Sequence, residues 1–295
     1  MPAWLDDNLV SILNGFAIGA LLFILAVGLS IVFGMMDVLN LAHGALYLGG
    51  AYLGYQFISG DGGWSGWLLA LGAALLAGLL AGGVLSVMTE PLARRPHLDQ
   101  ALLTLGVALV VAELLAIGYG NDVLRVPAPP GLDGSVQVAG NTYPVYRLVL
   151  IGIGAMLALV VYLVVERTTV GALVRASVAD REMVAAIGVD NRKVKLAVLG
   201  AGSSLAALAG VLGGPVYGAG PGLDERVLIL ALVVVVIGGL GSIRGALIGA
   251  LLIGQVESLG RALVPDLASF VLFGALALVL IVRPRGLFGA PKAAV

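Results

Sequence analysis

Apolar runs long enough to cross a membrane recur along almost the whole of this chain. It has 295 residues, of which 60% are hydrophobic and only 11% are charged. A soluble domain usually has about 25% charged residues, so this sequence lacks the polar surface that a water-exposed fold needs. A helix needs ~20 mostly apolar residues to cross the hydrocarbon core of a bilayer. The sequence therefore predicts an all-α, polytopic transmembrane bundle.

Hydropathy and helix-breaking residues predict eight or nine membrane spans within a single transmembrane domain over residues 1–295. The number stays open because the region 226–260 is either two spans or one broken hairpin. Transmembrane β-strands alternate polar and apolar residues, and the run LILALVVVVIGGLG at 228–241 does not, so a β-barrel is rejected. The expected spans cover residues 10–35, 41–58, 66–89, 99–118, 148–165, 196–217, 226–241, 245–260 and 267–283.

Glycines are abundant, 44 in all, and several recur at four-residue steps, as in Gly78-x-x-x-Gly82 and Gly245-x-x-x-Gly249. Small residues at this spacing allow helix backbones to approach closely in lipid. We expect these glycines to lie at helix–helix contacts.

The distribution of Lys and Arg predicts which loops are cytoplasmic, because cytoplasmic loops carry an excess of both. Twelve of the 16 basic residues fall on one side if that side holds Arg94, Arg95, residues 166–195, Arg244 and the segment after residue 282. We therefore expect the C-terminus in the cytoplasm and, with an odd number of spans, the N-terminus outside. The 120–146 loop, rich in Pro and Gly, is expected to be extracytoplasmic and made of turns.

Several functional classes are excluded or disfavoured by what the sequence lacks. The net charge is −1 with no polybasic segment, so we expect no nucleic-acid partner. There are no cysteines and only two histidines, so no metal site is expected. The phosphate-binding motif G-x-x-x-x-G-K-[ST] is absent, and no Ser/His/Asp set suggests a membrane enzyme. Any use of ATP would have to take place on another polypeptide.

One hydrophilic insert interrupts the apolar runs. Residues 166–195 carry ten charged side chains, in a chain with 16 basic and 17 acidic residues. Within the insert, GALVRASVADREMVAAIG at 171–188 is predicted to form an amphipathic helix that stops at Gly188. Its apolar face is predicted to hold Leu173, Ala176, Met183, Val184 and Ile187. Such a helix can lie on lipid or dock into a soluble partner, and the mixed charges of Arg175, Arg181 and Glu182 favour a protein partner.

A second group of polar residues lies in FGMMDVLNLAHGALYLGGAY at 33–52. Asp37, Asn40 and His43 follow one another at three-residue steps and would share one side of a helix. Polar residues at membrane depth usually face a cavity or a partner, so these three and Tyr47 are candidates for the substrate pathway. The alternative is a short turn in which Asp37 or Asn40 caps the next helix.

Two further features leave alternatives open. The segment GGLGSIRGALIG at 238–249 is either a tight turn or a broken helix, and Arg244-Gly245-Ala246-Leu247 echoes the tetrapeptide HGAL at 43–46, which hints at an internal repeat. Glu257, inside an apolar run, either lines the pathway or pairs across a subunit interface. Tyr217 is interpreted as an ordinary interfacial aromatic residue.

Four segments, in order, resemble the permease subunits of branched-chain amino-acid ABC importers. They are GLSIVFGMMDVLNLAHGALYLGGAY, RASVADREMVAAIGVDNRKVKLAVLGAGSSLAALAGVL, GGLGSIRGALIG and RPRGLFG. The most specific parts are residues 40–44 and GGLGSIRGA. Within the family the chain is more similar to the shorter, H-type subunit.

The resemblance implies a bacterial inner-membrane permease that pairs with an identical or M-type second permease subunit. It also implies two cytosolic ATPase subunits, which would bind ATP and Mg²⁺, and an extracytoplasmic substrate-binding protein. No cofactor is expected on this chain. Residues 171–188 would then be the coupling helix seated on an ATPase, and Ala179, Asp180, Ala185, Ala186 and Gly188 fit the family's loop pattern. At Asp37 and Arg244 the chain departs from that pattern.

The expected function is therefore translocation of branched-chain or related small amino acids in an ATP-driven importer. Close relatives within the family imply urea, short amides or aromatic acids as alternative substrates, and a related group implies sugars. A stand-alone secondary carrier would instead need ion-coupling carboxylates, for which the candidates are Asp37, Glu113 and Glu257.

Overall fold

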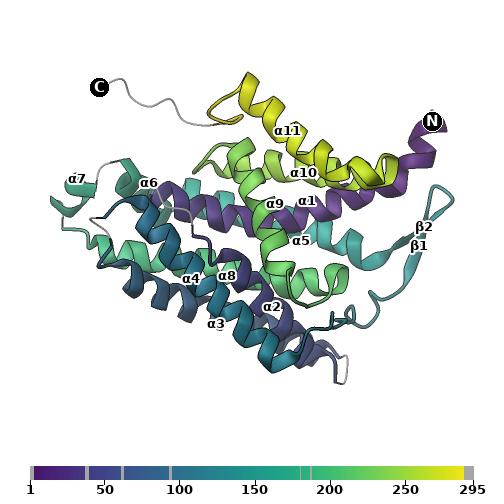
Figure 1. The fold of residues 1–295 in the computed structure, drawn as a ribbon, viewed down its shortest axis with the longest axis horizontal. Helices are drawn as coiled ribbons and strands as arrows, with labels where there is room; N and C mark the ends of the chain where they lie inside the picture. The colour runs from purple at the N-terminus through teal and green to yellow at the C-terminus, as the bar shows by residue number, and fades with distance from the viewer. Residues whose placement is uncertain are drawn as a thin grey trace.

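The computed structural model describes residues 3–36, 40–60, 63–92, 95–179, 181–186 and 188–288. Helices dominate this part of the chain, with one β-hairpin and one short 3₁₀ turn at Pro265–Leu267 (Figure 1). The elements are α1 (Ala3–Met36), α2 (His43–Ile58), α3 (Trp64–Thr89), α4 (His97–Tyr119), β1 (Ser135–Val138), β2 (Asn141–Pro144), α5 (Val145–Arg167), α6 (Thr169–Ala179), α7 (Arg181–Ala186), α8 (Asn191–Tyr217), α9 (Leu223–Gly238), α10 (Ile243–Leu263) and α11 (Ala268–Val282).

Each of the nine predicted spans corresponds to one helix, which confirms the all-α transmembrane bundle. Among the described residues, seven helices are long and apolar enough to cross a membrane. The two shorter ones, α2 and α9, have 16 residues each. The region 226–260 forms two helices joined by a tight turn, in which Gly239 and Gly241 have positive φ angles of 102° and 78°. The open choice between a turn and a broken helix is thus decided in favour of the turn.

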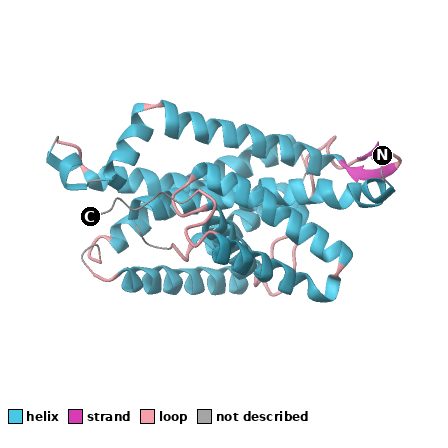
Figure 2. Cartoon of the chain, turned by 90° about the horizontal axis from the view of Figure 1, so that it is seen from above, coloured by secondary structure: helices cyan, strands magenta, loops and turns pink. Residues whose placement is uncertain are grey.

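The two ends of the bundle differ in character. The start of α1 and the β-hairpin lie at one end, and α6 and α7 lie at the other (Figures 1 and 2). The end of α1 meets the turn between α9 and α10, because Gly34 lies against Gly241. The chain after α11 reaches the same turn, where Leu287 N donates to Ile237 O at 2.8 Å. The segments predicted to be cytoplasmic therefore gather at the α6–α7 end.

Two groups of four helices, α1–α4 and α8–α11, have matching packing partners. Helix α1 packs along α10 and α8 packs along α3, while α1 contacts α8 and α2 contacts α9. Helices α1 and α8 are antiparallel, because Gly202 faces Gly28 and Gly213 faces Leu21. This arrangement supports an inverted internal repeat. However, HGAL begins α2 and RGAL lies at the start of α10. The two similar tetrapeptides therefore lie on helices that do not correspond to each other in the packing.

Glycines allow the central helices to touch through their backbones, as predicted. A Cβ atom on Gly78 would lie 2.4 Å from Ser204 Cα, and one on Gly82 would lie 2.4 Å from Leu199 O. Helix α3 therefore meets α8 with almost no side chain between them. Gly245 is equally close to Gly238, so the predicted small-residue contact also holds together the α9–α10 hairpin.

The outer helices expose apolar side chains along their length. Leu80 on α3 is 71% exposed, Ile117 on α4 is 74% exposed and Ile281 on α11 is 79% exposed. A soluble protein would not leave such surfaces in water. Apolar surfaces of this kind are suited to contact with the hydrocarbon core of a membrane.

The 120–144 loop differs from the sequence-based expectation, which was a series of turns. It contains an antiparallel hairpin in which Val136 pairs with Tyr143 and Val138 pairs with Asn141. Ala139 and Gly140, both with positive φ angles, form its two-residue turn, which suits the twist of a hairpin. An isolated bridge between Leu124 and Ala219 then ties the loop to the segment after α8.

Candidate functional site

The start of α2 lies inside the bundle. His43 is fully buried, and its Nε2 atom lies 3.0 Å from the carbonyl oxygen of Leu25 on α1. Leu25 precedes the end of α1 by about 16 Å at the rise of an α-helix. The predicted pathway residue His43 therefore lies deep among apolar helices, as residues at membrane depth do when they have a partner.

Asn40 lies before α2 and not on it, so the expected common helix face does not form. Its Oδ1 atom accepts a hydrogen bond from Ala42 N at 3.1 Å, and its carbonyl oxygen accepts one from His43 N. This matches the short turn of the alternative prediction, in which the Asn40 side chain stabilises the turn. Asn40 is not the cap of α2, because the N-cap residue is Ala42 and it has no side-chain cap hydrogen bond. Leu41 N also donates to Thr104 on α4. Asp37 is outside the described residues.

The first turn of α9 packs against the first turn of α2. A Cβ atom on Gly44 would lie 2.4 Å from Asp224 O and 2.9 Å from Leu228 Cβ. Both helix N-termini carry a partial positive charge, and Asp224, in the first turn of α9, is largely buried. The two short helices thus bring their polar ends together in the interior.

Several polar atoms near these helices are buried without a hydrogen-bond partner in the described part of the chain. They include Asn40 Nδ2, His43 Nδ1, Tyr47 Oη, Tyr52 Oη and Ser203 Oγ. Buried polar atoms are nearly always hydrogen-bonded in folded proteins. Unsatisfied atoms on three of the predicted pathway residues therefore mark a polar line through an otherwise apolar bundle.

A second polar group lies around Tyr217, at the end of α8. The guanidinium of Arg226 lies 5.3 Å from the centre of the Tyr217 ring. Arg226 Nη2 also donates to Glu257 Oε1 at 3.3 Å, and Arg261, one turn further along α10, donates to the same oxygen. Glu257 thus pairs within this chain, with its carboxylate held between two arginines.

Sequence reasoning missed most of this second group. Tyr217 was interpreted as an interfacial aromatic residue, and Arg226 entered only the count of basic loop residues. The sequence did contain a signal, because charged and aromatic residues occur together near the outer ends of three expected spans. It could not be read as a cluster, because the sequence does not show how the ends of the consecutive helices α8, α9 and α10 pack together.

The hydrophilic insert forms two helices, α6 and α7, in place of the single predicted helix. The predicted stop at Gly188 is correct, since Gly188 has a φ angle of +87° and its N–H donates to Ala185 O. On α7, Val184 is buried whereas Met183 is 62% exposed, so the predicted apolar face is divided between the protein interior and the solvent. Asp180 and Ile187 lie outside the described residues, as do the side chains of Ala179, Arg181 and Glu182.

Arg175 connects α6 back to α5. It donates to the carbonyl oxygen of Val165 and forms an ion pair with Glu166 at 3.8 Å. Ala185 and Ala186 are exposed on α7. The insert therefore presents small apolar residues at its tip, while a charged side chain anchors its base.

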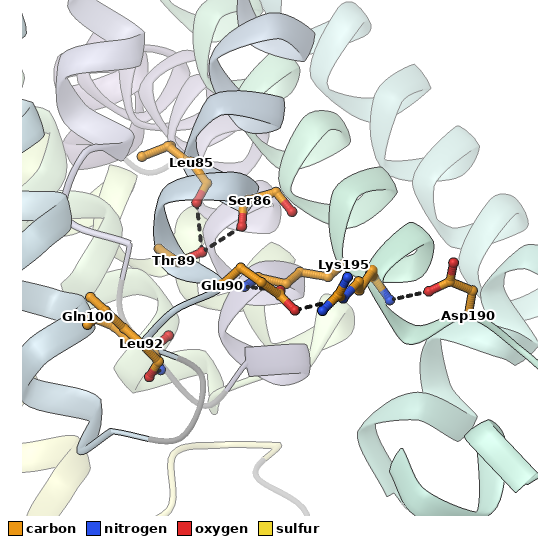
Figure 3. A network of polar contacts seen from close by, with 9 residues as sticks. Leu85, Ser86, Thr89, Glu90, Leu92, Gln100, Asp190 and Lys195 are labelled. Carbon is orange, nitrogen blue, oxygen red and sulfur yellow. Dashed lines mark hydrogen bonds and ion pairs between the residues drawn. The ribbon is translucent and has the colours of Figure 1, made fainter.

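Ion pairs join α3 and α8 beside this insert (Figure 3). Glu90, just after α3, accepts from Arg192 Nε at 3.0 Å and from Lys195 Nζ at 3.4 Å. Asp190 caps α8 by accepting from Arg192 N at 3.0 Å. The start of α8, where the insert enters the bundle, is therefore attached to α3 through a single carboxylate.

The chain is similar to known transport proteins over most of its length. The high-affinity branched-chain amino acid transport system permease protein LivH of Escherichia coli (strain K12) is 29% identical, over 95% of this chain and 94% of the relative. BraD of Pseudomonas aeruginosa, which has the same description, is 27% identical over 96% of each chain. A probable branched-chain amino acid transport permease protein, LivH of Methanocaldococcus jannaschii, is 26% identical over 81% of this chain and 76% of the relative.

No solved structure gives a significant match to the chain. The family model described as branched-chain amino acid transport system / permease component matches residues 11–281. That range runs from α1 to the last turn of α11 and includes both short helices and the α6–α7 insert. The chain therefore belongs to the family of permease components of branched-chain amino acid transport systems.

Proposed function

We propose that this chain is the translocation subunit of an ATP-driven importer for branched-chain or related small amino acids. The observation that supports it most is the family match over residues 11–281, together with relatives named as branched-chain amino acid permeases. The polar line through the bundle, from Asn40 past His43 to Tyr47, is the candidate pathway for a small polar solute.

The α6–α7 insert is the proposed contact with an ATPase subunit. Exposed Met183, Ala185 and Ala186 on α7 provide a small apolar surface, which suits docking into a groove of a soluble protein. The ion pairs of Glu90 with Arg192 and Lys195 would carry a displacement of the insert into α8 and α3. On this proposal Arg175 and the 179–188 segment are coupling residues, and ATP and Mg²⁺ bind on the partner.

The proposed assembly has a second permease subunit, identical or paralogous, two ATPase subunits and an extracytoplasmic substrate-binding protein. The excess of Lys and Arg at the α6–α7 end indicates that this end faces the cytoplasm. The hairpin end and the N-terminus would then face outward from the inner membrane, towards the binding protein.

Charge placed on α7 tests the coupling role. In the complete transporter reconstituted in vesicles, Met183→Asp should abolish co-purification of the ATPase and reduce leucine uptake about tenfold or more, because a buried unpaired charge opposes docking. Met183→Leu, which keeps an apolar side chain at the same exposed position, is the control and should keep both. Normal uptake by Met183→Asp, or by a variant lacking residues 176–186, would refute the coupling role.

A competition experiment tests the substrate. Uptake of labelled leucine by whole cells should be suppressed by unlabelled leucine and isoleucine, and much less by urea, an aromatic acid or ribose. A protonophore-sensitive flux through this chain alone, without any ATPase, would instead indicate a secondary carrier.

A further inference from the structure

Few basic residues lie at the hairpin end of the bundle, yet three of them interact electrostatically with one tyrosine, Tyr217. Arg147 begins α5, Arg226 lies in the first turn of α9 and Arg261 lies in the last turn of α10. All three lie within electrostatic range of Tyr217, and the guanidinium of Arg226 is 5.3 Å from the centre of its ring. Helix α5 and the consecutive helices α9 and α10 therefore each contribute one arginine to this end of the bundle.

Glu257 pairs with two of these arginines, because its Oε1 atom accepts from both Arg226 and Arg261. Asp224 and Glu225 precede Arg226 in the first turn of α9. Arg147 donates to the neutral Oδ1 atom of Asn14. Two guanidiniums therefore share one carboxylate oxygen, and the third is paired with a neutral amide.

The site is reachable and its strongest donor is only partly used. The side chain of Arg226 is 41% exposed, and it makes one hydrogen bond, to a single oxygen of Glu257. A guanidinium has five N–H donors arranged to hold both oxygens of a carboxylate. Arg226 therefore retains donors for a second anionic group beside Glu257.

Two phenol groups add donors on the buried side of Arg226. The Oη atoms of Tyr47 and Tyr217 are both buried and lack a hydrogen-bond partner in the described structure. Tyr47 is 1% exposed, and its Oη would lie 1.9 Å from a Cβ atom on Gly213, one helical turn before Tyr217 on α8. The two rings thus reach the same part of α8, and each hydroxyl requires an acceptor.

We propose that Arg226, Tyr217 and Tyr47 bind the carboxylate group of the transported solute, and that Glu257 holds Arg226 in place when no solute is present. Arg226 supplies charge-assisted hydrogen bonds, and the two hydroxyls donate to the same carboxylate from the interior. The site takes amino acids or other small carboxylic acids and discriminates against amides, amines and sugars. This inference rests on the proposed function. On this inference, the solute pathway runs between the hairpin end and His43.

The test uses the complete transporter in vesicles with its binding protein, and the same amount of assembled complex for each variant. Arg226→Gln should reduce leucine uptake about tenfold or more, and Tyr217→Phe should reduce it about fivefold, because hydrogen bonds to charged groups are lost. Arg226→Lys should restore part of the uptake, since charge returns without the two-pronged geometry.

The matched control is Arg125→Gln. Arg125 is the fourth basic residue at this end of the bundle, and it is exposed. Uptake by this variant should stay within about twofold of the unaltered protein. Equal effects of Arg125→Gln and Arg226→Gln would overturn the inference, because general surface charge would then explain both.

Failure of the proposed carboxylate site can be distinguished from failure of the proposed function. If the unaltered transporter takes up leucine and Arg226→Gln does so equally well, the carboxylate site is wrong and the proposed function stands. If the substrate proves to be an aromatic acid whose uptake depends on Arg226, the site stands and the branched-chain substrate is wrong. Uptake of urea or ribose in place of leucine, unchanged in Arg226→Gln, would refute both.

Discussion

The Nε2 atom of His43 lies 3.0 Å from the carbonyl oxygen of Leu25, in the buried middle of α1. A carbonyl oxygen only accepts hydrogen bonds, so Nε2 carries the proton and Nδ1 is left as an acceptor. This contact anchors the beginning of α2 within the bundle, beside the first turn of α9. The candidate pathway is therefore built around a helix that starts in the protein interior.

Replacing His43 by Leu should lower the free energy of unfolding by about 1–3 kcal/mol, because the buried Leu25 carbonyl loses this donor. Thermal unfolding of the purified protein in detergent measures the change. His97→Leu, at the exposed start of α4, is the control and should cost less than ~1 kcal/mol. Equal losses would mean that the Leu25 contact contributes nothing specific.

Adding a methyl group at Gly50 should disrupt the contact between α2 and α8. A Cβ atom there would lie 2.0 Å from the carbonyl oxygen of Ala207, so Gly50→Ala forces the helices apart and should cost about 1–3 kcal/mol. At Gly49 a Cβ atom has nothing within 4 Å. Gly49→Ala should therefore be neutral, or stabilising by up to ~1 kcal/mol, and a similar loss in both variants would contradict the packing explanation.

The ion pairs of Glu90 should make a small, salt-dependent contribution. Glu90 is 37% exposed whereas the Lys195 side chain is only 13% exposed. Because exposed ion pairs contribute about 0–1 kcal/mol, this partly buried pair should lie at the upper end of that range, at about 1 kcal/mol. A double-mutant cycle with Glu90→Gln and Lys195→Met, measured at low and high salt, determines it. The pair Arg95 and Asp99, with exposed fractions of 67% and 37%, serves as the control and should give a smaller value.

Tyr146 provides a test of how α5 is held against α8. Its hydroxyl donates to the carbonyl oxygen of Leu212 at 2.6 Å, and both groups are buried. Tyr146→Phe should cost about 1–2 kcal/mol in thermal unfolding, because a buried hydrogen bond is lost while the ring still packs. Tyr162→Phe, elsewhere on α5, should cost less, and a reversed order would show that the hydrogen bond is not formed.

Much of the fold could be predicted because bilayer physics leaves few choices. Long uncharged runs must become helices in lipid, since every backbone polar group has to be paired within its own segment. For this reason a helix appears at each expected span, with small shifts at the ends, and in the described part of the chain seven of these helices are long and apolar enough to cross a membrane. The stop at Gly188 was also predictable, because glycine accepts the positive φ angle found there.

The candidate site was only partly predictable. His43 and Glu257 stood out as polar residues in apolar runs, and both are buried. Arg261 is four residues after Glu257 on α10, so its pairing with Glu257 is a local i,i+4 contact. The other partners, Leu25 for His43 and Arg226 for Glu257, could not be identified, because pairing across the bundle depends on which helices are neighbours. The division of the insert into α6 and α7 was missed because the periodicity of 171–188 is compatible with one helix.

By itself the sequence determined the membrane-spanning helical class, the segments that form the helices and the family, since these depend on local hydropathy and on residue motifs. Only the tertiary structure decided that α2 begins beside the middle of α1, that α9 meets it there, and that three arginines converge on Tyr217. Those relationships arise when backbones pack across glycines such as Gly44 and Gly50. Helix packing is a long-range property, and no local pattern in the chain encodes which helices meet.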